Sequence, residues 1–107
     1  MKICVPTLGV RGLDDYVCEH FGQAPTFTIF DLETNEVKVL FSKDEHMGHM
    51  PKILADAGID VVVCSVIGHG AIDMLKQLGI EVYVGAYGTV REAIQEWQEG
   101  RLEVAIE

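Results

Sequence analysis

The second half of the chain contains two similar segments, in each of which a helical pattern ends at a glycine and a strand pattern follows at once. The pairs Gly58-Ile59 and Gly79-Ile80 occupy equivalent places in these segments, and glycine commonly follows a helix end. The run Val61–Cys64 is wholly apolar, as expected of a strand covered on both faces. Helices that alternate with such strands connect them in parallel by right-handed crossovers. This half therefore predicts an α/β fold.

Three helices are predicted from apolar spacing and from end signals. The first begins near Pro51, whose missing N–H is not needed in a first turn, and ends before Gly58. The second has an apolar stripe at helical spacing, formed by Ala71, Met74, Leu75 and Leu78. The third begins at a capping box made by Thr89 and Glu92 and ends at Gly100. The Glu-rich end of the chain is expected to be a solvated face and tail.

The first half of the chain is less regular. Residues 2–6 and 26–31 read as strands, the second rich in β-branched and aromatic side chains. Residues 37–42 alternate between two faces and follow a turn at 33–36, so they predict an antiparallel hairpin with the preceding strand. Residues 7–25 show no clear period and contain three glycines and a proline.

With a further strand at 82–84, the predicted elements follow the order βββαβαβα. The crossovers and the hairpin together predict a five-stranded mixed sheet with helices on its faces, in three layers. This is the layout of the ribonuclease H-like fold, and layout alone says nothing about function. A length of 107 residues fits one domain, so residues 1–107 are expected to form a single domain.

The composition excludes several classes of protein. The formal net charge is −9 and the 8 Lys and Arg are scattered, which argues against nucleic acid and against an anionic membrane surface. No apolar run approaches the roughly 20 residues of a membrane span, and the N-terminus lacks the apolar core of a signal peptide. A cytoplasmic protein is expected, with its three cysteines reduced. Cys4 and Cys64 lie in apolar strands and are expected in the core.

The first candidate site is the His-x-x-His pattern at His46 and His49, in a loop that contains Gly48. Two imidazoles at this spacing can face one metal ion, and neutral imidazole binds iron, zinc and copper. Two histidines do not complete a coordination shell, so other ligands would have to come from elsewhere. The alternative is a pair of solvated loop histidines.

The second candidate is Cys18 with His20. If this segment is a strand, two residues of separation place the thiol and the imidazole on one face, where both can serve as ligands. The alternative is a buried thiol beside a histidine that bonds a neighbouring backbone.

The third candidate is Gly68-His69-Gly70, between a buried strand and a helix. Ligands in open α/β sheets lie outside the carboxyl ends of strands, and a helix N-terminus offers free N–H groups there. Gly85–Gly88 holds the equivalent place in the next unit, and neither segment is a P-loop. The alternative is a pair of tight βα-turns, which is the preferred interpretation for Gly85–Gly88.

Catalytic patterns are missing from the sequence. It contains no G-x-S-x-G and no H-E-x-x-H. A two-metal nuclease needs carboxylates gathered on central strands, whereas the first strand has none. The chain is therefore not expected to be an enzyme.

Several segments in one order resemble the dinitrogenase iron–molybdenum cofactor biosynthesis family, the NifX/NafY-like nitrogenase accessory proteins. The first is His20–Phe27, which is similar to the family's HFGxAPxF-like segment. The others are Gly58–Val63, Ile67-Gly68, Ala71–Ile80, Gly88–Ala93 and Gly100–Leu102. The ordered set spans nearly the whole chain.

This resemblance implies a non-catalytic protein that carries or stores an iron–sulfur or molybdenum-containing cluster or its precursor. It implies cluster-donor and cluster-acceptor partners, and the same ribonuclease H-like fold. The family often has a His-Gly element before the first helix, where His46, Gly48 and His49 stand here. The cluster is then expected between these residues and Cys18–His20, with Gly68–Gly70 as a wall. The alternative is a metal-free regulatory or scaffold domain that binds a small anion or a protein at the βα-turns.

Overall fold

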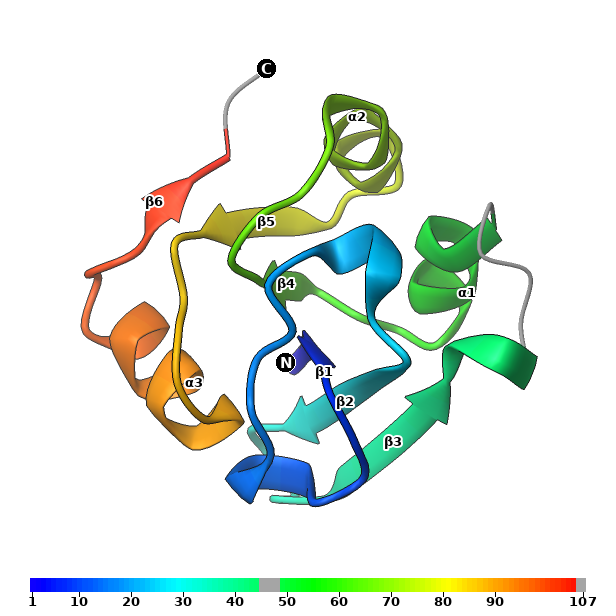
Figure 1. Cartoon of the computed structure of the whole chain (residues 1–107). Helices are drawn as coiled ribbons and strands as arrows, with labels where there is room; N and C mark the ends of the chain where they lie inside the picture. The colour runs from blue at the N-terminus through cyan, green and yellow to red at the C-terminus, as the bar shows by residue number, and fades with distance from the viewer. Residues whose placement is uncertain (45–48, 106–107) are drawn as a thin grey trace.

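The structure, a computed structural model, describes residues 1–44 and 49–105 (Figure 1). Its strands are β1 (Lys2–Thr7), β2 (Thr26–Asp31), β3 (Val37–Phe41), β4 (Val61–Val63), β5 (Glu81–Val84) and β6 (Glu103–Val104). Its α-helices are α1 (Met50–Asp56), α2 (His69–Gln77) and α3 (Val90–Gln98). Three short 3-10 helices are η1 (Gly12–Asp14), η2 (Phe21–Gln23) and η3 (Ser42–Asp44). Within this described part, no helix has the length and apolar character needed to cross a membrane.

The strands form one mixed sheet in the order β3-β2-β1-β4-β5-β6. β1 is parallel to β4, and β4 is parallel to β5. β2 runs antiparallel to both of its neighbours, β1 and β3. The predicted order βββαβαβα is confirmed for the elements from β1 to α3, as are the β2–β3 hairpin and the parallel arrangement of β4 and β5.

The prediction of five strands is wrong, because β6 adds a sixth strand beside β5. Its two residues pair antiparallel, Tyr83 with Val104 and Val84 with Glu103. A strand of this length is too short to show the alternation that identifies strands in sequence. The open edge of β5 pairs with it, in a region that the charge pattern alone marked as a solvated tail.

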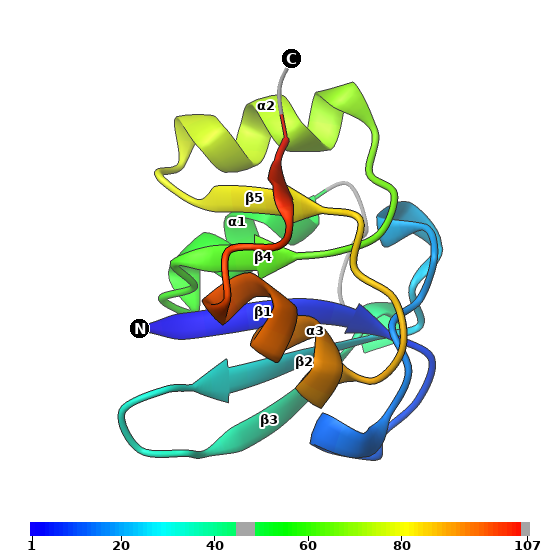
Figure 2. The ribbon, with the colours of Figure 1, turned by 90° about the vertical axis from the view of Figure 1, so that its left-hand side faces the viewer.

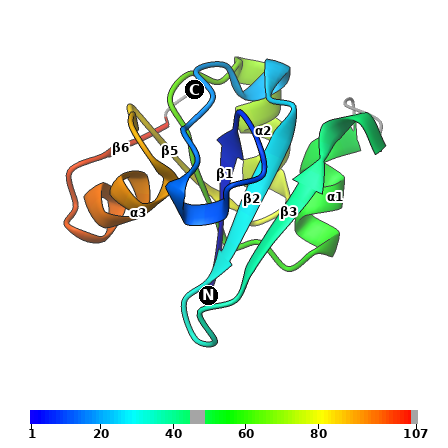
Figure 3. The same cartoon turned by 60° about the horizontal axis from the view of Figure 1, so that its bottom comes forward.

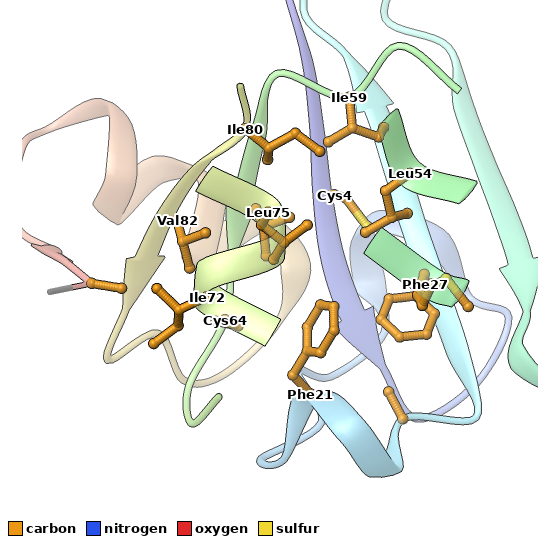
Figure 4. Packing of buried hydrophobic residues seen from close by; sticks show 14 of the residues in the cluster. Cys4, Phe21, Phe27, Leu54, Ile59, Cys64, Ile72, Leu75, Ile80 and Val82 are labelled. Carbon is orange, nitrogen blue, oxygen red and sulfur yellow. The ribbon is translucent and has the colours of Figure 1, made fainter. Parts of the chain in front are cut away.

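Two apolar cores lie on opposite faces of the sheet. α1 and α2 cover one face and α3 covers the other (Figure 3). In the first core, Leu54 of α1 and Leu75 of α2 are fully buried, and the ring of Phe21 meets that of Phe27 edge-on at 5.2 Å (Figure 4). Burying each such side chain contributes about 1.5–3 kcal/mol to folding. The irregular segment before β2 thus supplies part of the main core through Phe21.

The carboxyl ends of β1, β4 and β5 lie at one edge of the sheet. Figure 2 shows their arrowheads pointing the same way, towards the loops that follow them. These loops comprise residues 8–25 after β1, residues 64–68 after β4 and residues 85–89 after β5. Of the site residues predicted from the sequence, Cys18, His20 and Gly68 lie in these loops. His69 and Gly70 begin α2, and His49 lies at the N-terminus of α1.

Candidate functional site

Residues 15–21, within the loop after β1, form a crossing segment that runs over this edge and bonds to β1 and to the loops after β4 and β5. The Cys18 N–H donates to the Pro6 carbonyl of β1 at 2.9 Å. The Val17 N–H donates to the Gly88 carbonyl at 2.8 Å, which joins the segment to the loop after β5. The Val66 N–H donates to the Glu19 carbonyl at 2.9 Å, which joins it to the loop after β4. The crossing segment therefore sets the relative positions of the loops.

A buried carboxylate anchors the start of the crossing segment. Asp15 is 1% exposed, and its two oxygens accept the backbone N–H groups of Arg11 at 2.9 Å and Tyr16 at 2.7 Å. A side chain at Gly9 would approach Asp15 Oδ2 to 2.9 Å, so glycine leaves room for the carboxylate. This part of the chain is ordered by polar contacts, and these leave no periodic pattern in the sequence.

A group of buried threonines holds the same region to the sheet. Thr7 Oγ1 lies 2.6 Å from Thr26 Oγ1 and 3.0 Å from Thr28 Oγ1. The Thr26 hydroxyl also lies within donating distance of the Gly9 carbonyl, at 2.6 Å. Buried hydroxyls need such partners, and here the partners join β1, β2 and the loop after β1.

Cys18 and His20 lie in different environments. Cys18 is 8% exposed, and its thiol donates to the His20 carbonyl at 3.6 Å, within the core under α2. The His20 side chain is 51% exposed, with Nε2 3.9 Å from Glu19 Oε1. The segment bends at Glu19 and is not a continuous strand. The condition for one shared face is therefore not met.

His49 occupies the N-cap position of α1 without a side-chain capping bond and is exposed, and Pro51 lies in the first turn as expected. His46 and Gly48 lie outside the described residues. The His-x-x-His pattern is accordingly represented by His49 alone.

The Gly68–Gly70 segment begins α2, with Gly68 at the N-cap and His69 exposed as the first helical residue. His20 forms a parallel bridge with Val66, two residues before Gly68. The second and third candidate segments are therefore neighbours across the edge. Gly85 and Gly88 have φ of +93° and +85°, which suits the tight βα-turn that the sequence favoured there.

Cys4 and Cys64 lie in the first core, as predicted, and both are fully buried. Burial raises the pKa of the Cys4 thiol, and the nearby Cys64 raises it further. Burial also raises the pKa of Cys64, to about 12. Both thiols stay protonated, which makes them poor metal ligands. Within residues 1–44 and 49–105, no three His, Cys, Asp or Glu side chains form a group that could hold a metal ion.

Sequence reasoning missed two features of this edge. Ser65 is 6% exposed and its Oγ has no hydrogen-bond partner in the described part of the chain. Its signal was a polar residue directly after a buried strand. The second feature is a set of exposed large apolar side chains on the loops, namely Leu8, Val10, Tyr16, Val66 and Tyr87. Exposure of this kind needs the tertiary structure to be seen.

These features define a small α/β protein whose candidate site is built by loops at the carboxyl ends of parallel strands. Residues 1–100 match the family model described as dinitrogenase iron-molybdenum cofactor. The chain belongs to this family, which confirms the resemblance inferred from the ordered segments.

Similar proteins come from several organisms. An uncharacterized protein of Methanocaldococcus jannaschii, MJ0580, is 29% identical over 96% of this chain and 90% of its own length. The apo form of the orange protein from Desulfovibrio gigas has a TM-score of 0.87 at 29% identity, covering 97% of this chain and 92% of that one. A candidate NifB protein from Thermotoga, TM1290, has a TM-score of 0.82 at 30% identity, covering 96% and 91%.

Proposed function

We propose that this chain binds an iron–sulfur or molybdenum-containing cluster, or its precursor, and carries or stores it without turnover chemistry. The match of residues 1–100 to the family model is the observation that carries this proposal. A second support is the similar fold of the orange protein, whose structure is that of an apo form. The ribonuclease H-like layout stays a prediction.

The proposed ligands are the imidazoles on the carboxyl edge of the sheet. His20 and His49 are exposed there, and with His46 they supply the nitrogen donors that suit iron and copper. His69, Gly68 and Gly70, together with Gly48, are proposed to line the cluster. Exposed ligands suit a carrier, because a carrier has to release what it binds.

Cys18 is the least accessible member of the proposed ligand set. Its thiol points to the His20 carbonyl and is almost closed off from water. To bind a metal as a thiolate, it would have to break this bond and turn outwards. We therefore propose Cys18 as a ligand that engages only after the crossing segment moves.

The charge of the protein opposes an anionic cargo. The net charge is −9, so the local donors of the site have to outweigh the overall field. Backbone N–H groups at a helix N-terminus can do so at short range. The first turn of α2 contains no acidic residue, which is consistent with this requirement.

The partners proposed for this function are a protein that donates the cluster and a protein that accepts it. Tyr87 is 67% exposed, and Leu8 and Tyr16 are also exposed on the same edge. Clustered exposed apolar side chains are typical of interaction sites. They lie on loops of the same edge as His20, where we propose that a transfer partner docks.

Anaerobic reconstitution with ferrous iron and sulfide, with and without molybdate, tests the proposal. Metal content and visible absorbance are measured on the parent, on His20→Ala, on His46→Ala/His49→Ala and on Cys18→Ala. Lys76→Ala, an exposed change in the last turn of α2, serves as the control and should load as the parent does. Lower loading of the histidine variants supports the site.

Two negative outcomes have different meanings. Equal loading of the parent and all the histidine and cysteine variants would show that the ligand assignment is wrong. A parent that takes up no metal would overturn the cluster function, and would favour the metal-free regulatory or scaffold role.

A further inference from the structure

An open depression of about 400 Å³ lies where α2 begins, beside β5 and β6. Ser65 and His69 line it on the side of the loop and the helix. Ile67, Val84 and Val104 provide an apolar wall, and Glu103 lies on the β6 side. The depression exists because β6 pairs with β5, so the sequence prediction of five strands did not contain it.

Ser65 is the polar group in this depression that needs a partner. It is 6% exposed, and its Oγ makes no hydrogen bond within residues 1–44 and 49–105. Buried hydroxyls in folded proteins nearly always have a hydrogen-bond partner. A buried hydroxyl that lacks one points to a ligand that supplies it. The neighbouring Ser65 carbonyl accepts the Gly85 N–H at 3.2 Å, so the backbone of this residue is held while its hydroxyl is unpaired.

The N-terminus of α2 offers further donors at the same place. Its N-cap is Gly68, no side chain caps it, and its first turn has no acidic residue. The first turn of a helix leaves N–H groups without intrahelical partners and carries partial positive charge. A Cβ added at Gly68 or Gly70 would meet no atom within 4 Å. The space beside these two glycines at the helix end is thus open to an approaching ligand.

We propose that this depression binds a small organic anion. Its oxygen-bearing acidic head, a carboxylate or a phosphate ester, lies at the first turn of α2 and accepts hydrogen bonds from the free N–H groups and from Ser65. Its uncharged apolar part lies against Val84 and Val104. The Glu103 carboxylate repels a second negative group at that end, which selects an apolar remainder.

Binding requires one local movement. Ser65 Oγ is covered in this conformation, so the side chain turns about its Cα–Cβ bond when the anion enters. Such rotamer changes are fast and local. The site shares the first turn of α2 with the wall of the proposed cluster site, but it needs no metal or cluster. It therefore goes beyond the proposed carrier function and is tested on metal-free protein.

Titration of metal-free, ¹⁵N-labelled protein in phosphate-free buffer tests the site. Hexanoate and phenyl phosphate carry an acidic head and an apolar part, whereas acetate and inorganic phosphate carry the head alone. We expect the two larger probes, or one of them, to shift the amide signals of Ser65, His69 and Gly70. The affinity should exceed that of the matching head by about tenfold or more, because apolar area is buried. Binding of hexanoate would identify the acidic head as a carboxylate, and binding of phenyl phosphate would identify it as a phosphate ester.

Two variants separate binding from folding. Ser65→Ala should lower the affinity by about fivefold to tenfold, while Ser42→Ala, in η3, leaves it unchanged. Gly68→Asp places a carboxylate at the uncapped N-terminus, where the backbone is extended with φ −77° and ψ 156°. This variant should melt at a higher temperature, because aspartate is a good N-cap, and should lose binding because its own carboxylate occupies the donors.

The proposal is overturned if neither larger probe shifts these amides, or if they bind no tighter than acetate and phosphate. It is also overturned if Gly68→Asp is stabilised and still binds as the parent does. Loading of the protein with iron and sulfide is a separate measurement. A failure of the anion probes to bind therefore does not bear on the cluster function.

Discussion

The irregular segment 7–25 and the regular half 50–105 are held by different forces. In the regular half, α2 and α3 place apolar stripes on the sheet, and Leu75 and Val90 are fully buried. In the irregular segment, Asp15 and the threonines around Thr7 hold the chain through polar contacts. Apolar burial follows from spacing in the sequence, whereas a network of single hydrogen bonds does not. The candidate site lies where the two regions meet.

The largest effect is expected in the regular half. Leu75→Ala removes a fully buried side chain from the core between α2 and the sheet and should lower the free energy of unfolding by about 2–5 kcal/mol. Guanidinium denaturation measures the loss, with the exposed neighbour Lys76→Ala as the control. A loss below about 1 kcal/mol would show that α2 is not held by its apolar stripe.

The next effect tests the irregular segment. Asp15→Ala leaves the Arg11 and Tyr16 N–H groups without their carboxylate partner and should lower the free energy of unfolding by about 1–3 kcal/mol. Hydrogen exchange should accelerate at the Val17 and Cys18 amides while those of α2 in the regular half change less. Asp14→Ala is the control, since its ion pair with Arg91 is exposed and contributes under about 1 kcal/mol. Unchanged exchange in the crossing segment would contradict the anchoring role of Asp15.

The sequence predicted most of the fold because its strongest signals are local and periodic. The capping box at Thr89 and Glu92 and the buried run Val61–Cys64 appear in the structure as predicted. The predicted apolar stripe of α2 is wrong in part, because Leu75 is fully buried whereas Met74 and Leu78 are exposed and Ile72 is buried instead. β6 escaped prediction, since a pair of residues acquires strand structure only when β5 offers an edge.

The sequence predicted where the candidate site lies in the fold better than it predicted how the side chains are arranged there. Cys18, His20 and Gly68–Gly70 do gather at one edge, because strand direction follows from the alternation of helices and strands. Their exposure did not follow from the spacing, since the bend at Glu19 leaves Cys18 in the core and His20 at the surface. The unpaired hydroxyl of Ser65 could not be predicted for a similar reason, because whether a hydroxyl has a partner depends on three-dimensional packing.

A smaller effect is expected at the start of α3, where the two regions touch through the Asp15 carbonyl and the Val90 N–H. Thr89→Ala removes the capping hydroxyl that accepts the Glu92 N–H and should lower the free energy of unfolding by about 1 kcal/mol. Thermal denaturation measures this loss, with Thr34→Ala in the exposed β2–β3 turn as the comparison. An equal loss in both variants would contradict the capping role.

The same variant has a pH signature. The Thr89 N–H, and then its hydroxyl, donate to Glu92 and hold the pKa of this carboxyl below its usual value. A lowered pKa in the folded state gives stability that is present above the unfolded pKa and is lost as the pH falls through the folded pKa. In Thr89→Ala, NMR titration should show the Glu92 pKa moving up towards its usual value. No movement would mean that the hydroxyl does not bond the carboxylate.

The smallest change in the free energy of unfolding is expected at Ser65, where the substitution should stabilise the protein rather than destabilise it. Ser65→Ala removes a buried hydroxyl that has no partner in the described part of the chain, so the free energy of unfolding should rise by about 1 kcal/mol or less. The other variants weaken the fold because each removes a contact, whereas this one removes an unpaired group. Thermal denaturation of anion-free protein measures the change, and a clear loss of stability would show that the hydroxyl is paired.

Adding the anion should reverse the order of stability of the parent and Ser65→Ala. A ligand that binds only the folded state stabilises it in proportion to occupancy, so hexanoate or phenyl phosphate should raise the melting temperature of the parent more than that of Ser65→Ala. A residue that weakens the free protein and strengthens the bound one is retained for binding, as is common where a site is kept at some loss of stability. Parallel shifts in both proteins would mean that Ser65 takes no part in holding the anion.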